Sequence, residues 1–259
     1  MGSSRFSQFA PLMSELPDAA FGSPAMLDSR LVLAREGRLT IAYAPFDHIE
    51  QGARLVLVGL TPGHQQMVAA LRAAREALRM GTGYAEAAAR AKRTASFAGP
   101  MRRNLADMLD HLGLARWLGA GSCAEMWDRE GFVHFTSALR YPVFIDGKNY
   151  SGQPNLLRTP LLRGFVETTL SEEVRHLQHA LFVPLGEGAA AALLHLVKRG
   201  QLARERVLDG LPHPSGANAE RIAYFLGRKA RSALSTKTDP DRIDAARTAL
   251  ELRVAQLTS

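Results

Sequence analysis

The chain has 259 residues, of which 46% are apolar, enough for one large domain or two small ones. It carries 32 lysines and arginines against 25 acidic residues, and the resulting net charge of +7 suits a polyanionic partner such as nucleic acid. No apolar run is long enough to cross a bilayer, and the single cysteine, Cys123, excludes a disulfide framework and a cysteine-ligated zinc or iron–sulfur site, so we expect a cytoplasmic protein without a membrane partner.

The first part of the chain predicts an arm, a hairpin and a buried strand. Residues 1–30 lack the charged-then-apolar order of a secretory signal, and we expect a flexible N-terminal arm there. Residues 31–44 contain two β-type runs around Glu36-Gly37, which is typical of a β-hairpin. The continuous apolar run 54–60 predicts a strand buried on both faces, followed by a turn at 61–63 and a helical pattern through Leu78.

Strands and helices alternate over the rest of the chain. Helical patterns occur at 84–93, 102–112, about 161–179, 187–198, around Ile222 and Phe225, and from about 239; strand-like runs occur at 131–139, 180–185 and 206–211. This order predicts an α/β fold, a three-layer α/β/α sandwich around a four-stranded parallel sheet with an N-terminal β-hairpin and extra helices. We expect one main domain over 31–235 and a C-terminal helix over 236–259 packed on it.

Three loops that leave the predicted parallel strands carry chemically useful side chains. Ligands of such sheets bind at the carboxyl ends of the strands, so Thr61, Thr136 and His213 are expected at one rim. His213 stands between Pro212 and Pro214, and proline fixes its own φ and restricts the residue before it. The sequence therefore predicts a histidine whose backbone is restrained.

Five short motifs in order resemble the uracil-DNA glycosylase superfamily. Gly59-Leu-Thr-Pro-Gly63 is similar to its Gly-Leu-Asn-Pro-Gly motif, and Ser96-Phe-Ala-Gly99 is similar to the Pro-Phe-Val-Gly segment of the thermostable branch. The segment 134–142 resembles that branch's Ile-Thr-Asn strand, and Val183-Pro-Leu-Gly186 resembles its Leu-Gly before a helix. His213-Pro-Ser215 resembles the His-Pro-Ser motif, followed by the loop that probes the DNA stack.

The resemblance implies a DNA glycosylase that acts without a metal or organic cofactor, as a monomer with DNA as its partner. Such an enzyme flips the target base out of the stack and hydrolyses its bond to deoxyribose. It implies catalytic roles for His213, as the donor to the departing base, and Thr61, near the attacking water. It implies base contacts by Gly59, Pro62, Gly63, Phe97 and Thr136, and DNA contacts by Ser215, Gly216, Asn218, Arg221, Arg102 and Arg103.

Two residues depart from the family pattern and leave the substrate open. Thr61 stands where many active branches have Asp or Asn, and Thr136 stands where the thermostable branch has the Asn that contacts uracil. Losing a bidentate contact to a base lowers discrimination by about 1–3 kcal/mol. The base is therefore either a bulky modified pyrimidine, such as those of some phage DNA, or uracil held through His213 and backbone groups.

Two further interpretations compete with a DNA glycosylase. The absence of Asp or Asn at position 61 favours a degenerate family member that binds DNA without cutting it. The run Gly186-Glu-Gly188 after a strand, with Asp209 farther along, imitates the fingerprint of a dinucleotide-binding oxidoreductase.

Overall fold

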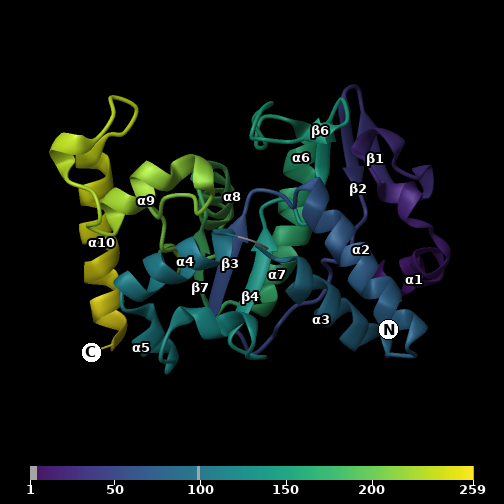
Figure 1. Cartoon of the computed structure of the whole chain (residues 1–259), viewed down its shortest axis with the longest axis horizontal. Coiled ribbons are helices and arrows are strands. Elements are labelled where there is room, and N and C mark those ends of the chain that lie inside the picture. Colours follow the sequence, from purple (N-terminus) through teal and green to yellow (C-terminus); the bar gives the residue numbers. More distant parts are fainter. Residues whose placement is uncertain (1–4, 98–99, 259) are drawn as a thin grey trace. The chain divides into compact units, whose positions relative to one another are not determined.

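The computed structural model describes residues 5–97 and 100–258, which divide into two compact units. The first unit contains the described residues of 1–49, 59–96 and 135–176; the second contains those of 50–58, 97–134 and 177–259. Each unit is therefore built from three stretches of sequence. Figure 1 shows the elements in chain order.

The first unit contains a four-stranded antiparallel sheet of order β1-β2-β5-β6. Its strands are β1 (Val32–Glu36), β2 (Leu39–Ala42), β5 (Val143–Ile145) and β6 (Lys148–Asn149). The predicted hairpin is confirmed: Glu36 pairs with Leu39 across a two-residue turn whose first residue, Gly37, has φ +53°. Glycine suits this turn because it adopts positive φ without steric cost.

The described residues of the first unit form the helices α1 (Arg5–Glu15), α2 (His64–Arg79), α3 (Tyr84–Ala95), α6 (Pro160–Phe165), the π-helix η5 (Val166–Leu170) and α7 (Ser171–His176). Short 3-10 turns η1 (Asp18–Phe21), η2 (Pro24–Met26) and η3 (Ser29–Leu31) precede β1. The predicted apolar face of α2 is buried through Met67, Ala70, Leu71 and Ala74. The α2 helix packs against both α1 and α3.

Where we expected a loose arm over 1–30, the structure has α1 and the three 3-10 turns. Phe6, Ala10 and Met13 of α1 are buried. Arginines of α2 bind the segment that follows α1: Arg72 pairs with Asp18 at 2.8 Å, and Arg75 contacts both Asp18 and the carbonyl of Leu16. Apolar burial and ion pairs therefore attach this segment to the first unit.

The parallel sheet has three strands rather than the predicted four. Its order is β4-β3-β7, with β3 (Leu55–Gly59), β4 (Val133–Ser137) and β7 (Leu181–Pro184) all buried. The fourth predicted strand, 206–211, contributes only a single parallel bridge between Val207 and Phe182. The next residue of β7 that faces this segment, Pro184, has no N–H to donate to it, so the ladder stops there. Side chains of Arg204 and Arg253 bind the Val207 carbonyl, which faces away from β7, at 2.8 and 2.6 Å.

In the part of the second unit that the structure describes, the α-helices are α4 (Pro100–His111), α5 (Leu114–Leu118), α8 (Glu187–Lys198), α9 (Ala219–Phe225) and α10 (Pro240–Thr258). Its 3-10 turns are η4 (Cys123–Trp127), η6 (Arg204–Arg206), η7 (Gly216–Asn218) and η8 (Arg231–Ala233). The C-terminal helix α10 lies against α5 and α9 and buries Leu250 and Val254. Gly210 approaches this helix closely, because a Cβ there would meet the Ala246 methyl at 3.1 Å.

Candidate functional site

His213 lies in an irregular loop of the second unit, between the Val207 bridge and η7. Its Nδ1 accepts the backbone N–H of Ser215 at 3.2 Å, so the proton of a neutral ring is on Nε2. Among the described residues, Nε2 has no hydrogen-bond partner. Partial burial lowers the pKa of His213 from its usual value because the charged ring is less well solvated. The side chain is therefore a neutral imidazole with an available N–H donor.

Two neighbours fix this histidine loop. A Cβ on Gly186 would lie 3.4 Å from Cδ2 of His213, so the ring packs directly on the glycine before α8. Gly186 has φ +97°, a conformation that other residues rarely adopt. On the other side, the Asn104 amide of α4 donates to the carbonyl of Pro214 at 2.9 Å. Neither contact has a local sequence signal, so neither was predicted from the sequence.

The predicted DNA-contacting residues that follow His213 form one hydrogen-bonded chain. The Asn218 amide donates to Ser215 Oγ at 3.2 Å, and Arg221 donates to Asn218 Oδ1 at 3.0 Å and to the Lys237 carbonyl at 3.1 Å. Gly216 is exposed at the start of η7. The structure therefore brings His213, Ser215, Asn218 and Arg221 together on one short segment.

The Gly59–Gly63 loop belongs to the first unit, and its threonine is already engaged. Thr61 Oγ1 donates to the carbonyl of Tyr141 at 3.1 Å and accepts the backbone N–H of Val143 at 3.2 Å. A hydroxyl has one donor and two acceptor positions, so only one lone pair remains for a water. Pro62 is buried, and Gly63 begins α2, where its N–H donates to Gln66 Oε1.

The Thr136 hydroxyl, unlike that of Thr61, is not engaged by any described residue. It lies on β4 with 7% of its surface exposed, and its Oγ1 has no hydrogen-bond partner among the described residues. Leaving a buried hydroxyl without a partner costs about 1–3 kcal/mol. Such a group in a folded protein calls for an explanation, and a bound ligand is one.

Phe97 combines burial with backbone strain. It is 8% exposed and has φ +48°, which is rare for an aromatic residue. Such a conformation costs on the order of 1–3 kcal/mol and is common at functional sites. Ala98 and Gly99 of the same motif lie outside the described residues. Thr61 and Thr136 belong to the first unit and Phe97 and His213 to the second, so their meeting at one rim stays a prediction.

The two arginines predicted to bind DNA on α4 differ in their surroundings. The Arg102 guanidinium lies over the ring of Trp127, 5.5 Å from its centroid, and is half-buried. Arg103 is exposed, and within the described chain it forms no ion pair. Of the two, Arg103 presents the more accessible charge.

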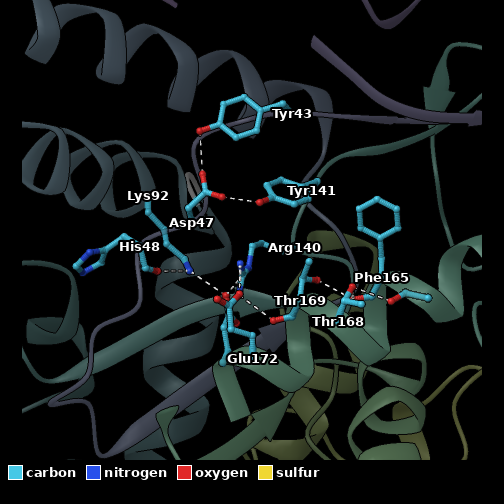
Figure 2. A network of polar contacts seen from close by, with 12 residues as sticks. Tyr43, Asp47, His48, Lys92, Arg140, Tyr141, Phe165, Thr168, Thr169 and Glu172 are labelled. Carbon is cyan, nitrogen blue, oxygen red and sulfur yellow. Dashed lines mark hydrogen bonds and ion pairs between the residues drawn. The ribbon is translucent and has the colours of Figure 1, made fainter. Parts of the chain in front are cut away.

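A buried polar network in the first unit was not predicted (Figure 2). Asp47 accepts hydrogen bonds from the hydroxyls of Tyr43, at 2.8 Å, and Tyr141. Lys92, 3% exposed, donates to the His48 carbonyl at 2.7 Å. Its ammonium also lies 3.4 Å from a carboxylate oxygen of Glu173, which is fully buried. Burial lowers the pKa of Lys92 to about 8.

No group of three or more His, Cys, Asp or Glu with metal-binding geometry occurs in the parts of the chain that the structure describes. Within residues 5–97 and 100–258, no helix has both the length and the apolar character needed to span a bilayer.

Comparisons with known proteins identify a relative of this chain. No protein-family model matches it, and no solved structure matches it. It is 36% identical over 226 residues to a protein of Bacillus subtilis (strain 168) with the name "Uncharacterized protein YoxB". The match covers 86% of this chain and 88% of that protein, so the similarity extends over most of both. The chain belongs to the YoxB family.

Proposed function

We propose that this protein is a monofunctional DNA glycosylase that hydrolyses the N-glycosidic bond of an altered pyrimidine and leaves an abasic site. The observation that carries the proposal is the state of His213: neutral, fixed by the Ser215 N–H and Gly186, and with Nε2–H available. The five motifs that resemble the uracil-DNA glycosylase superfamily support the same chemistry. The proposal includes that family's three-layer α/β/α arrangement, DNA as the partner, a monomeric state and a cytoplasmic location.

The imidazole would act on the departing base. Cleavage leaves negative charge on the base, and a fixed N–H directed at the base oxygen stabilises that charge in the transition state. A neutral ring can do this at pH 7 because the pKa of His213 is lowered by burial. The restrained loop matters because a preorganised donor needs no reorientation during the reaction.

The remaining predicted residues would bind the nucleotide. Phe97 would stack on the flipped base, and that base would supply the hydrogen-bond partner that the Thr136 hydroxyl lacks among the described residues. Ser215 and the backbone of η7 would hold a phosphate, while Asn218 or Arg221 would fill the gap in the duplex.

The substrate is proposed to be a bulky modified pyrimidine, with uracil as the alternative. A threonine side chain is smaller than asparagine and makes a single, less directional contact. It therefore leaves more room in the pocket but selects uracil less strongly. Both bases remain compatible with a donor at His213.

A panel of oligonucleotides tests the proposal. Each duplex and single strand carries one uracil, 5-hydroxymethylcytosine or glucosylated pyrimidine, and modified phage genomic DNA is included. Released base is measured by mass spectrometry and abasic sites by alkaline cleavage. We expect His213→Gln to slow release at least about 100-fold. The matched control is His176→Gln at an exposed histidine of α7, which should react like wild type. Equal rates for wild type and His213→Gln would refute the role of the imidazole.

A second candidate is a family member that binds DNA without cutting it. The observation in its favour is that the Thr61 hydroxyl is engaged with Tyr141 and Val143, which leaves little capacity to hold a water. Tight DNA binding by both wild type and His213→Gln, with no abasic site on any DNA of the panel, would establish this alternative.

A further inference from the structure

A π-helical turn interrupts the helix that runs over 160–176. The α-helical segments α6 and α7 are joined by the π-helix η5, Val166–Leu170. The hydroxyl of Thr169 donates back to the Phe165 carbonyl at 2.7 Å. π-Turns are rare and occur frequently at functional sites. This turn therefore calls for a reason beyond local sequence preference.

One side chain connects this helix to the segment after β4. The Arg140 guanidinium donates through Nε to Glu173 at 2.8 Å, through one terminal nitrogen to Glu172 at 2.9 Å, and through the other to the Thr169 carbonyl at 2.8 Å. Figure 2 shows Arg140 pointing at Glu172 and Thr169. Arg140 is only 5% exposed. The planar guanidinium of Arg140 thus binds a carbonyl of the π-turn and two carboxylates at the start of α7.

The segment that carries Arg140 is held on its other side by the loop after β3. The N–H groups of Ala138 and Leu139 donate to the carbonyls of Gly59 and Leu60 at 2.8 and 2.9 Å. Two residues farther on, Thr61 bonds the backbone of Tyr141 and Val143. The backbone over 138–143 is therefore hydrogen-bonded to the loop after β3, and the Arg140 side chain connects the same segment to the π-turn.

Thr136 lies four residues before Arg140, on the strand that leads into this fixed segment. Its unpartnered hydroxyl can meet a ligand only if the end of β4 keeps its path. We propose that Arg140 is a positioning residue for the base site: it clamps 138–143 to the π-turn and so sets where Thr136 presents its hydroxyl. This inference rests on the proposed function.

Two variants and a matched control test the clamp. Arg140→Lys keeps the charge but cannot contact three acceptors in one plane. Glu172→Gln weakens the contact between Arg140 and Glu172 by removing the negative charge of the acceptor. The Glu172 side chain is 43% exposed, so we expect this variant to fold even if Arg140→Lys does not. The control, Arg38→Lys, makes the same change in an exposed ion pair with Asp146.

Hydrogen exchange gives the readout that does not need a substrate. We expect exchange in the peptide over 135–145 to become at least about tenfold faster in Arg140→Lys and a few-fold faster in Glu172→Gln, with peptides from α2 and α3 unchanged. Unchanged exchange over 135–145 in both variants, or an equal rise across the whole unit, would overturn the clamp.

Single-turnover release from the best DNA of the panel tests the link to the site. For Arg140→Lys we expect a rate constant lower by roughly 10–100-fold while the Kd for the same DNA stays within about twofold. A buried pair with only a structural role would leave the rate of the folded protein unchanged, and that result would overturn the positioning role. Wild type that releases no base refutes the proposed function, and with it the role of Arg140 at a base site, while the exchange data still decide whether the clamp exists.

Discussion

Replacing the buried Lys92 by Met should change how stability depends on pH. In an unfolded chain this lysine has its ordinary pKa of 10.5, whereas in the fold burial lowers the pKa to about 8. Between these values the unfolded chain binds more protons than the folded one, so the free energy of unfolding rises with pH. The shift corresponds to about 3 kcal/mol gained by pH 10.5, relative to pH 7, from this group alone.

Several charged and ionisable groups act on Lys92 in this cluster. Its ammonium faces Glu173, and the positive charge of Arg140 and negative charge of Asp47 also act on it. Although burial opposes it, the nearby Glu173 raises the pKa of Arg140, so this guanidinium keeps its charge between pH 8 and 10.5. Burial raises the pKa of Tyr43 and Tyr141. These hydroxyls therefore do not ionise in the fold at these pH values.

Urea unfolding of wild type and Lys92→Met at several pH values between 7 and 10.5 measures the effect. Other groups, such as Cys123 with its raised pKa, lower the stability of both proteins at high pH, and they cancel in the difference. We expect the wild type to gain about 3 kcal/mol over the variant across this range. A difference that stays constant with pH would show that Lys92 is not a desolvated ammonium and would refute the reasoning.

Two further predictions concern the His213 loop. Gly186→Ala should lower the free energy of unfolding by about 1–3 kcal/mol, because a φ of +97° is strained for alanine. The added methyl itself would meet the His213 ring at an ordinary contact distance. Urea unfolding measures the effect, with Gly216→Ala as the control, because a Cβ at Gly216 would meet nothing within 4 Å. The decline of base release at low pH should be centred below 6.5, because burial lowers the pKa of His213 from its ordinary value of 6.5; a decline centred above 6.5 in the pH–rate profile would contradict this.

Local patterns predicted most of the elements. The hairpin follows from alternating residues around Gly37, and α2 follows from apolar residues at helical spacing. The buried strands β3 and β7 follow from apolar runs of strand length. Each of these signals lies within about ten residues of sequence, so no distant partner was needed to interpret it.

The fourth strand shows where local patterns fail. Residues 206–211 have an apolar content suited to a strand, and the Leu208 N–H donates to the Phe182 carbonyl of β7 at 2.8 Å. The next bond of a parallel ladder would need the N–H of Pro184, which proline lacks, so the pairing stops after a single bridge. The apolar pattern of 206–211 cannot show that the neighbouring strand presents a proline at this point.

The candidate site was predictable only in part, because some of its contacts join residues that are distant in sequence. The two prolines around His213 indicated a restrained histidine, and the structure adds the Ser215 N–H that determines its tautomer. In contrast, Gly186 was interpreted through a family motif and through a dinucleotide fingerprint. Its contact with the His213 ring gives a physical reason for glycine at that position, and this reason requires neither motif.

Several arginines bind groups within the protein, so the net charge is a poor guide to DNA binding. The net charge of +7 suggested a surface for phosphates, yet Arg75 holds the segment after α1, Arg140 clamps a π-turn, and Arg253 caps the end of a sheet. These guanidiniums bind carbonyls inside the protein, so their charge counts in the total while their donors are unavailable to a phosphate. If DNA is the partner, as we propose, the phosphate contacts come from a smaller set such as the exposed Arg103, and we expect the affinity to depend on salt less strongly than the arginine content implies.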